Sequence, residues 1–92
     1  MSNYKIKYSK VFKKSLKKVI KQGKNIDNLL EIVELLSNKE KLELKYRDHA
    51  LTNDKRFKNC RDCHIEPDWI LIYEYLDEYL VLINTGSHSD IF

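Results

Sequence analysis

Two strongly apolar segments in the second half of this 92-residue chain limit what it can fold into. Residues 69–76 and 79–84 are rich in aromatic and β-branched side chains, and only Asp77 and Glu78 separate them. Such segments form β-strands, and so short a connection makes the two strands neighbours that pair antiparallel. A further strand is expected over 59–65, joined to the first by a turn at residues 66–68 that contains the only proline. The second half is therefore predicted to be a β-meander.

The first half predicts one strand followed by two helices. Residues 4–8 alternate apolar or aromatic side chains with lysines, which is the period of a strand with one wet face. Ser9 can cap a helix that ends at Gly23. This helix carries an apolar stripe at Phe12, Leu16, Val19 and Ile20.

A second helix is expected to start near Asn25 or Asp27 and to run to about Ser37. Its apolar residues are too dense for a surface helix, so it must pack on a sheet. A short strand is expected over 42–46. The order of elements predicts an α+β fold with an antiparallel or mixed sheet and both helices on one face, in a single domain over residues 1–92.

The composition favours a soluble domain. Apolar residue types make up 42% of the chain and charged residues 34%, yet no apolar run approaches the roughly 18 residues that a membrane span needs. Lysines run through the first 24 residues, which is unlike the apolar stretch of a signal peptide. Two cysteines are too few for a disulfide framework. We therefore expect a cytoplasmic protein that does not bind membranes.

The net charge of +3 conceals a segregation of charge along the chain. Residues 1–24 hold nine of the seventeen basic residues and none of the fourteen acidic ones, so the remainder holds eight basic and fourteen acidic residues. A basic segment of this kind attracts polyanions or an acidic protein partner. A solvated helix face that serves only solubility fits the same pattern, so both interpretations stay open.

The string Cys60-Arg61-Asp62-Cys63-His64 has the form of a haem-attachment motif. That chemistry needs export and a second axial ligand, which the chain does not offer. A zinc site built from both thiolates with His64 and His49 is disfavoured, because adjacent residues of a strand point to opposite faces. A thioredoxin-like redox pair would lie where a strand enters a helix, whereas here one predicted strand follows another. The favoured interpretation is that the cysteines are small buried side chains.

Three histidines, His49, His64 and His88, each stand beside a carboxylate or a hydroxyl that can orient the imidazole. If the meander is correct, His64 at the end of one strand lies near Asp68 in the following turn. His88 comes just after the last strand and can approach the same end of the sheet. We therefore expect His64, Asp68 and His88 to meet.

Three separated strings resemble the YafQ branch of the RelE/ParE toxin superfamily, and the resemblance spans essentially the whole chain. They are residues 48–51 (Asp-His-Ala-Leu), residues 61–69 with the strand that follows, and residues 85–92 (Thr-Gly-Ser-His-Ser-Asp-Ile-Phe). The resemblance implies a compact RelE-like fold and a type II toxin. It implies an endoribonuclease that enters the ribosomal A site, cleaves translated mRNA there, and is neutralised by a cognate antitoxin. Operator DNA is expected to be bound only through the antitoxin complex.

The resemblance also implies the site residues. Cleaving RNA without a metal requires a base for the ribose 2′-hydroxyl, a stabiliser for the phosphorane and an acid for the leaving 5′-oxygen. His88 is expected to be the acid, Asp68 or His64 the base, and His49 the stabiliser. No cofactor is expected. The expected substrate contacts are Phe92, Trp69, Arg61, Asp62, Arg47 and Lys45.

Phe92 is expected to stack on a base, although an apolar anchor closing on the core is also compatible with an aromatic residue there. Two departures from the family pattern stand out. Asn84 occupies the place where relatives commonly have an arginine, which leaves Arg61, Arg47, Lys45, Arg56 or a ribosomal group to supply positive charge. Residues 52–55 lack a glycine common there, which predicts an altered loop near His49. The alternative function is a non-catalytic ParE-like module that blocks a protein target.

Overall fold

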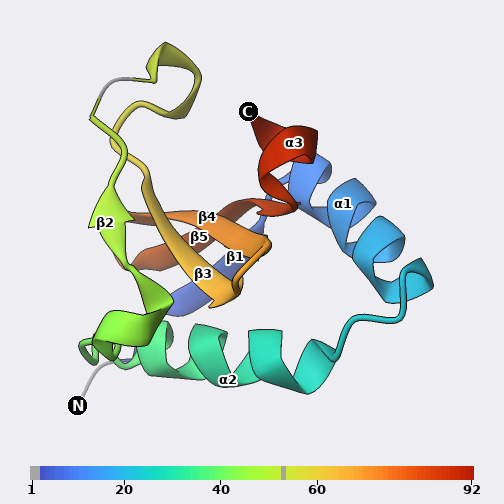
Figure 1. Cartoon of the computed structure of the whole chain (residues 1–92). Coiled ribbons are helices and arrows are strands. Elements are labelled where there is room, and N and C mark those ends of the chain that lie inside the picture. The colour runs from blue at the N-terminus through green and yellow to red at the C-terminus, as the bar shows by residue number, and fades with distance from the viewer. Residues whose placement is uncertain (1–2, 53) are drawn as a thin grey trace.

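The computed structural model describes residues 3–52 and 54–92, and over these ranges it forms a five-stranded sheet with helices on both faces (Figure 1). In chain order the elements are β1 (Lys5–Tyr8), α1 (Lys10–Lys21), α2 (Ile26–Ser37), the 3-10 helix η1 (Leu44–Tyr46), β2 (His49–Ala50), the 3-10 helix η2 (Lys55–Phe57), β3 (Arg61–Glu66), β4 (Trp69–Leu76), β5 (Tyr79–Gly86) and α3 (His88–Ile91). None of the helices in these ranges combines the length and the apolarity that crossing a bilayer requires.

The strand order is β1-β5-β4-β3-β2. The predicted meander is confirmed, because β3, β4 and β5 pair antiparallel through two short turns. β1 pairs parallel with β5 and makes the sheet mixed. β4 is the central strand, and Trp69 to Tyr73 are all buried, which explains why its apolar run is unbroken.

Both predicted helices form close to their expected bounds. The Ser9 side chain accepts a hydrogen bond from the backbone N–H of Phe12 and caps α1, while its own hydroxyl donates to the carbonyl of Ile83 on β5. Gly23 follows α1 with a φ of 81°, a left-handed conformation in which glycine is unstrained. Asn25 caps α2. The bond from Ser9 to Ile83 therefore ties the start of α1 to β5.

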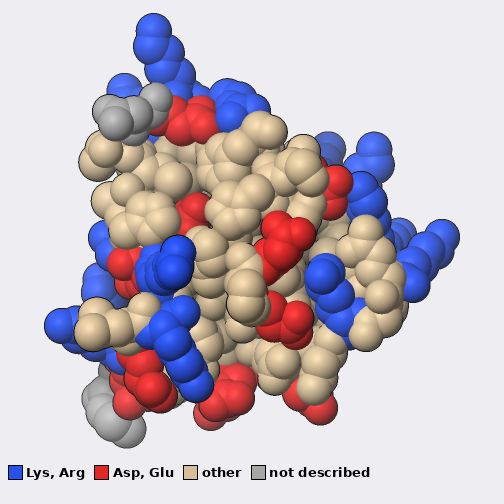
Figure 2. Space-filling view, viewed as in Figure 1, with Lys and Arg blue, Asp and Glu red and all other residues tan. Residues whose placement is uncertain are grey.

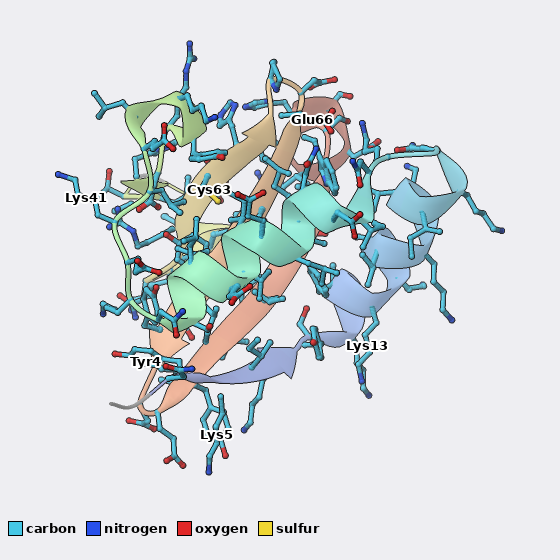
Figure 3. The ribbon with its side chains drawn as sticks, turned by 90° about the horizontal axis from the view of Figure 1, so that it is seen from below. Tyr4, Lys5, Lys13, Lys41, Cys63 and Glu66 are labelled. Atoms are coloured by element: carbon cyan, nitrogen blue, oxygen red, sulfur yellow. The ribbon has the colours of Figure 1, made fainter. Side chains whose placement is uncertain are left out.

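The two helices share one face of the sheet, as predicted. Phe12 and Val19 of α1 join Leu29 and Ile32 of α2 in a single core cluster. This cluster also contains the strand residues Cys63, Ile65, Trp69, Leu71, Tyr73, Leu80 and Leu82. Figure 3 shows α2 lying across the strands in front of Cys63, while Lys13 of α1 projects away from the sheet.

The opposite face of the sheet is covered by α3 and by residues 54–60, which precede β3 (Figure 1). A second, smaller core lies there and contains Cys60, Ile70, Ile72 and Ile91, with Leu51, Phe57 and Ile83 packed against it. The two cysteines therefore belong to different cores on different faces. They are buried apolar side chains, as the favoured interpretation held, and they cannot bind one metal ion together.

Three expectations about local structure were wrong. Residues 42–46 are not a strand, because Leu44–Tyr46 form η1 and Arg47 closes it with a φ of 49°. Ile20 is 52% exposed and lies outside the apolar stripe of α1. Both faces of β1 are exposed, so its alternation does not mark a buried side. The predicted change in the loop at 52–55 stays a prediction, since Asn53 lies outside the described residues; Lys55 begins η2.

Candidate active site

The sheet brings the three histidines to one rim. His49 lies on β2 opposite Asp62 of β3, and His64 lies two residues further along β3 on the same face as Asp62. His88 is the first residue of α3, directly after β5. The ring centroids of His64 and His88 are 5.1 Å apart. The predicted meeting of segments that are distant in the sequence is therefore present in the fold.

Asp68 completes the group from the turn between β3 and β4. Its Oδ1 atom lies 3.7 Å from Nδ1 of His88, and its side chain is 78% exposed. This places a carboxylate beside the ring that α3 presents. The contact engages Nδ1 of His88 and not Nε2, so the two ring nitrogens have different surroundings.

Asp62 lies at the centre of the group and is almost fully buried. Its Oδ1 atom lacks a hydrogen-bond partner among the described residues and is 3.8 Å from Nδ1 of His49. Burial raises the pKa of Asp62, and the positive charge that His49, His64 and His88 can carry acts in the opposite direction. A buried carboxyl with an unsatisfied oxygen is costly, which is typical of a functional site.

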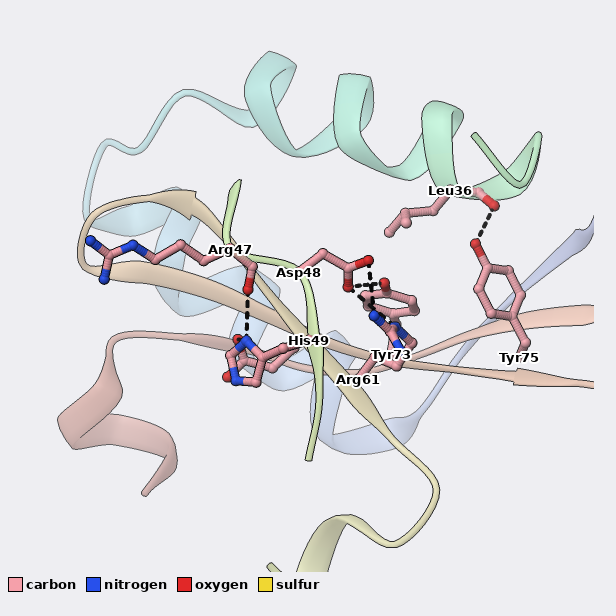
Figure 4. A network of polar contacts seen from close by, with 8 residues as sticks. Leu36, Arg47, Asp48, His49, Arg61, Tyr73 and Tyr75 are labelled. Atoms are coloured by element: carbon pink, nitrogen blue, oxygen red, sulfur yellow. Dashed lines mark hydrogen bonds and ion pairs between the residues drawn. The ribbon is translucent and has the colours of Figure 1, made fainter. Parts of the chain in front are cut away.

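The backbone of Arg47 fixes the ring of His49 (Figure 4). Nδ1 of His49 lies 2.7 Å from the carbonyl oxygen of Arg47. A carbonyl oxygen only accepts, so Nδ1 carries the proton and Nε2 is directed elsewhere. Arg47 holds its left-handed backbone conformation at this position, which shows how tightly the segment before β2 is shaped.

Lys45 and Arg47, two of the expected substrate contacts, reach the same rim. β2 pairs with β3 only at Arg61 and Asp62, so the edge of β3 beyond them is open. A cavity of about 510 Å³ lies along this open edge. Its lining includes Lys45, Arg47 and His64, together with Asn28 and Glu31 of α2. The two cations therefore stand next to the histidine rim.

Arg61 does not reach this site. Its side chain lies on the opposite face, where Nε and Nη2 donate to the two carboxylate oxygens of Asp48 at 3.3 Å each. The hydroxyl of Tyr73 donates to the same carboxylate, as Figure 4 shows. Neighbouring residues of β3 point to opposite faces, so Arg61 is turned away from the histidines, and its expected substrate contact stays a prediction.

Trp69 also differs from its expected role, because its side chain is fully buried. Its Nε1–H donates to Oγ1 of Thr85 at 2.8 Å, and that hydroxyl donates to the carbonyl of Ile70. The tryptophan therefore cannot contact a substrate from this position. It supports the end of β5, from which the chain continues to His88.

The side chain of Asn84 is engaged in hydrogen bonds within the protein. Its Oδ1 atom accepts hydrogen bonds from the Ser15 hydroxyl at 2.6 Å and from the backbone N–H of Thr85 at 2.8 Å. The asparagine ties α1 to β5 instead of supplying charge. Phe92 is 44% exposed, and its ring centroid lies 6.2 Å from that of His88, so it adjoins the site.

Arg56 and Phe57 of η2 also adjoin the site through Phe92. Sequence reasoning treated Arg56 only as one possible source of charge and passed over Phe57. The sequence contains part of the evidence for η2, because Asp54, two residues before Arg56, favours a local turn.

Comparison with known proteins agrees with this arrangement. The family described as "Bacterial toxin of type II toxin-antitoxin system, YafQ" matches residues 4–92. The chain belongs to the YafQ toxin family. The mRNA interferase toxin YafQ of Escherichia coli strain B / BL21-DE3 is 40% identical over 88 residues, which cover 95% of this chain and 94% of that protein.

Two solved structures extend the YafQ comparison to three dimensions. The metal-bound toxin from Helicobacter pylori superposes with a TM-score of 0.89 at 36% identity, covering 97% of this chain and 99% of that one. The E. coli DinJ-YafQ toxin-antitoxin complex contains a chain with a TM-score of 0.87 at 37% identity, with 98% of each chain covered. The chain is therefore a YafQ-type type II toxin with the α+β fold of its relatives.

Proposed function

We propose that this toxin is a ribosome-dependent mRNA endoribonuclease that cleaves translated mRNA in the A site by attack of the ribose 2′-hydroxyl. The observation that carries the proposal is the meeting of His49, His64 and His88 with Asp62 and Asp68 at one rim. Imidazoles exchange protons near neutral pH, which suits a reaction needing both an acid and a base. The E. coli relatives named mRNA interferase support the same chemistry.

The geometry favours a division of roles. Asp68 lies beside Nδ1 of His88, so the opposite nitrogen of His88 can donate a proton to the leaving 5′-oxygen. That use of Asp68 leaves His64 as the base that takes the proton of the 2′-hydroxyl. The two rings are close enough to serve the two oxygens of one phosphodiester.

His49 is proposed to stabilise the charge that develops on the phosphorane. The Arg47 carbonyl fixes its Nδ1–H, so Nε2 can donate to a phosphate oxygen when the ring is protonated. Asp62 lies next to this ring, with Oδ1 3.8 Å from Nδ1 of His49, and is proposed as its positioning residue. Lys45 and Arg47 extend the positive rim toward the cavity beside His64.

The reaction is proposed to need no metal ion. What supports this proposal is that side chains of the protein itself can serve as acid, base and cation at the rim. Cleavage is therefore expected to persist in the presence of a chelator that leaves the ribosome intact.

The lysines of α1 are proposed to contact ribosomal RNA. All six are exposed, and Lys18 is the only one with an ion pair among the described residues, formed with Asp90 of α3. Figure 2 shows blue side chains along the right-hand edge, where α1 lies. Each neutralised phosphate releases counterions, so ribosome binding should weaken steeply with salt.

A cognate antitoxin is proposed to neutralise the toxin, as DinJ is found together with YafQ in the E. coli complex. Operator DNA is proposed to be bound only through that toxin-antitoxin complex. Because its target is the translating ribosome, the toxin is proposed to act in the cytoplasm.

Primer extension on a translated message tests the proposal. The wild-type toxin should cut only when ribosomes are present, and His88→Ala should abolish cutting while antitoxin binding is unchanged. Lys41→Ala is the matched control, because Lys41 is exposed and lies away from the rim. Growth arrest that persists in a His49, His64, His88 triple alanine variant would instead support a ParE-like module that blocks a protein target.

A further inference from the structure

A cluster of flat side chains stands next to the histidine rim. The guanidinium carbon of Arg56 lies 5.4 Å from the ring centroid of Phe57 and 5.8 Å from that of Phe92. The two phenyl rings meet edge to face with centroids 5.8 Å apart. Arg56 and Phe57 come from η2, whereas Phe92 follows α3, so the fold joins two segments here. We call these three residues the aromatic-guanidinium cluster.

Arg56 is held in place by three sets of hydrogen bonds. Its Nε and Nη2 atoms donate to the two carboxylate oxygens of Asp54, at 3.1 and 2.8 Å. The backbone N–H of Arg56 donates to Oδ1 of Asp54, and Nη1 donates to the carbonyl of Ile91 at 3.3 Å. The edge of the guanidinium is therefore used inside the protein, and Asp54 compensates its charge.

One side of the cluster packs on the protein core, and the other side is exposed to solvent. Phe57 packs against the smaller core that contains Ile91. In contrast, the Arg56 side chain is 59% exposed and Phe92 is 44% exposed. Phe92 also lies 6.2 Å from His88, measured between ring centroids. A planar ligand on the cluster would therefore lie next to the proposed acid.

We propose that Arg56, Phe57 and Phe92 form a stacking site for one unpaired mRNA base next to the cleaved linkage. This inference rests on the proposed ribonuclease function and adds Arg56 and Phe57 to the base stacking already expected of Phe92. Proteins bind unstacked RNA bases on aromatic rings and on guanidinium planes. A phosphate is a poor fit for this arginine, because Asp54 already occupies its donor edge and balances its charge.

Synthetic messages with a single abasic nucleotide test the proposal on ribosome complexes. For the wild-type toxin, an abasic nucleotide at one position flanking the cleaved linkage should slow cleavage about tenfold, the usual contribution of one stacked base. Arg56→Ala and Phe57→Leu should slow cleavage of the intact message about tenfold. The abasic nucleotide should then cause little further loss, because its stacking partner is already gone.

Two variants separate stacking from other roles. Arg56→Lys keeps the positive charge but lacks the plane, so it should behave like Arg56→Ala. Lys58→Ala, an exposed change close to the same 3-10 helix, should retain the full response to the abasic nucleotide. Binding of the antitoxin, together with thermal melting, identifies any variant that is not folded, and Phe57→Leu keeps an apolar side chain in the smaller core.

The outcomes separate the two proposals. If Arg56→Ala and Phe57→Leu slow cleavage but still respond fully to the abasic nucleotide, the cluster only holds α3 in place and the stacking site is refuted. Wild-type activity in Arg56→Lys would show a phosphate contact and would also refute it. If the wild-type toxin cuts no message on ribosomes, the ribonuclease proposal fails, and the stacking site fails with it.

Discussion

Replacing Asp62 should make the protein more stable and less active. The residue is 3% exposed, and its Oδ1 atom has no hydrogen-bond partner among the described residues. Leaving a buried polar group unpaired costs about 1–3 kcal/mol. His49 offsets part of this cost, but its side chain is 54% exposed and water screens the attraction. We therefore expect Asp62→Asn to raise the free energy of unfolding by about 1–2 kcal/mol at pH 8.

The gain should depend on pH in a defined direction. Burial raises the pKa of Asp62 above its ordinary value of 3.8, so the folded protein binds this proton more tightly than the unfolded chain does. The stability that the group contributes is complete below its ordinary pKa and is lost as the pH rises through the raised value. The difference between wild type and variant should therefore be small near pH 3.5 and largest at pH 8.

Urea unfolding at several pH values measures this effect, and each kcal/mol should also move the melting temperature by about 4–8 °C. Asp62→Leu removes the polar group altogether and guards against an amide that is itself unsatisfied. Asp68→Asn is the control, because the exposed Asp68 should change stability by less than about 0.5 kcal/mol. Variants at Asp62 that are no more stable than wild type at pH 8, or equally shifted at every pH, would refute the reasoning.

Other changes test the supports of the site. Trp69→Phe should lower the free energy of unfolding by about 1–3 kcal/mol in urea titrations, because Thr85 loses its buried partner; an unchanged midpoint would contradict this. Asn84→Ala should cost about 1–2 kcal/mol in the same assay through its two lost hydrogen bonds. Cys60 and Cys63 should resist a thiol reagent at pH 8 until guanidinium is added, because burial raises the pKa of each; rapid labelling of the native protein would disprove it.

Most of the fold could be predicted from the sequence, because hydrophobic period and capping residues act locally. The segment 69–84 could only form a hairpin, and Ser9 and Asn25 start helices by accepting hydrogen bonds from the backbone just after them. Residues 42–46 were wrongly predicted to be a strand, because their alternation of apolar and charged residues resembles that of a strand. Arg47 adopts a left-handed conformation there, and its carbonyl contacts His49 two residues later, an irregular local geometry that the alternation of apolar residues does not indicate.

The site was only partly predictable for a similar reason. The alternation that separates Cys63 from His64 also places Arg61 on the face opposite Asp62, so this placement could have been predicted. The spacing of Ser87 and Asp90 is a helix-start signal for α3 that the sequence reading did not use. The unpaired oxygen of Asp62 results from its burial in the folded protein, so only the structure shows it.

The parallel pairing of β1 with β5 has a consequence for how the toxin folds during its synthesis. During synthesis the first strand emerges long before its neighbour exists, and a nascent chain must wait with an incomplete sheet. The ring that would protonate the leaving oxygen follows that late neighbour in the chain. On the proposed mechanism, an incomplete toxin that still lacks His88 cannot cleave the message that encodes it.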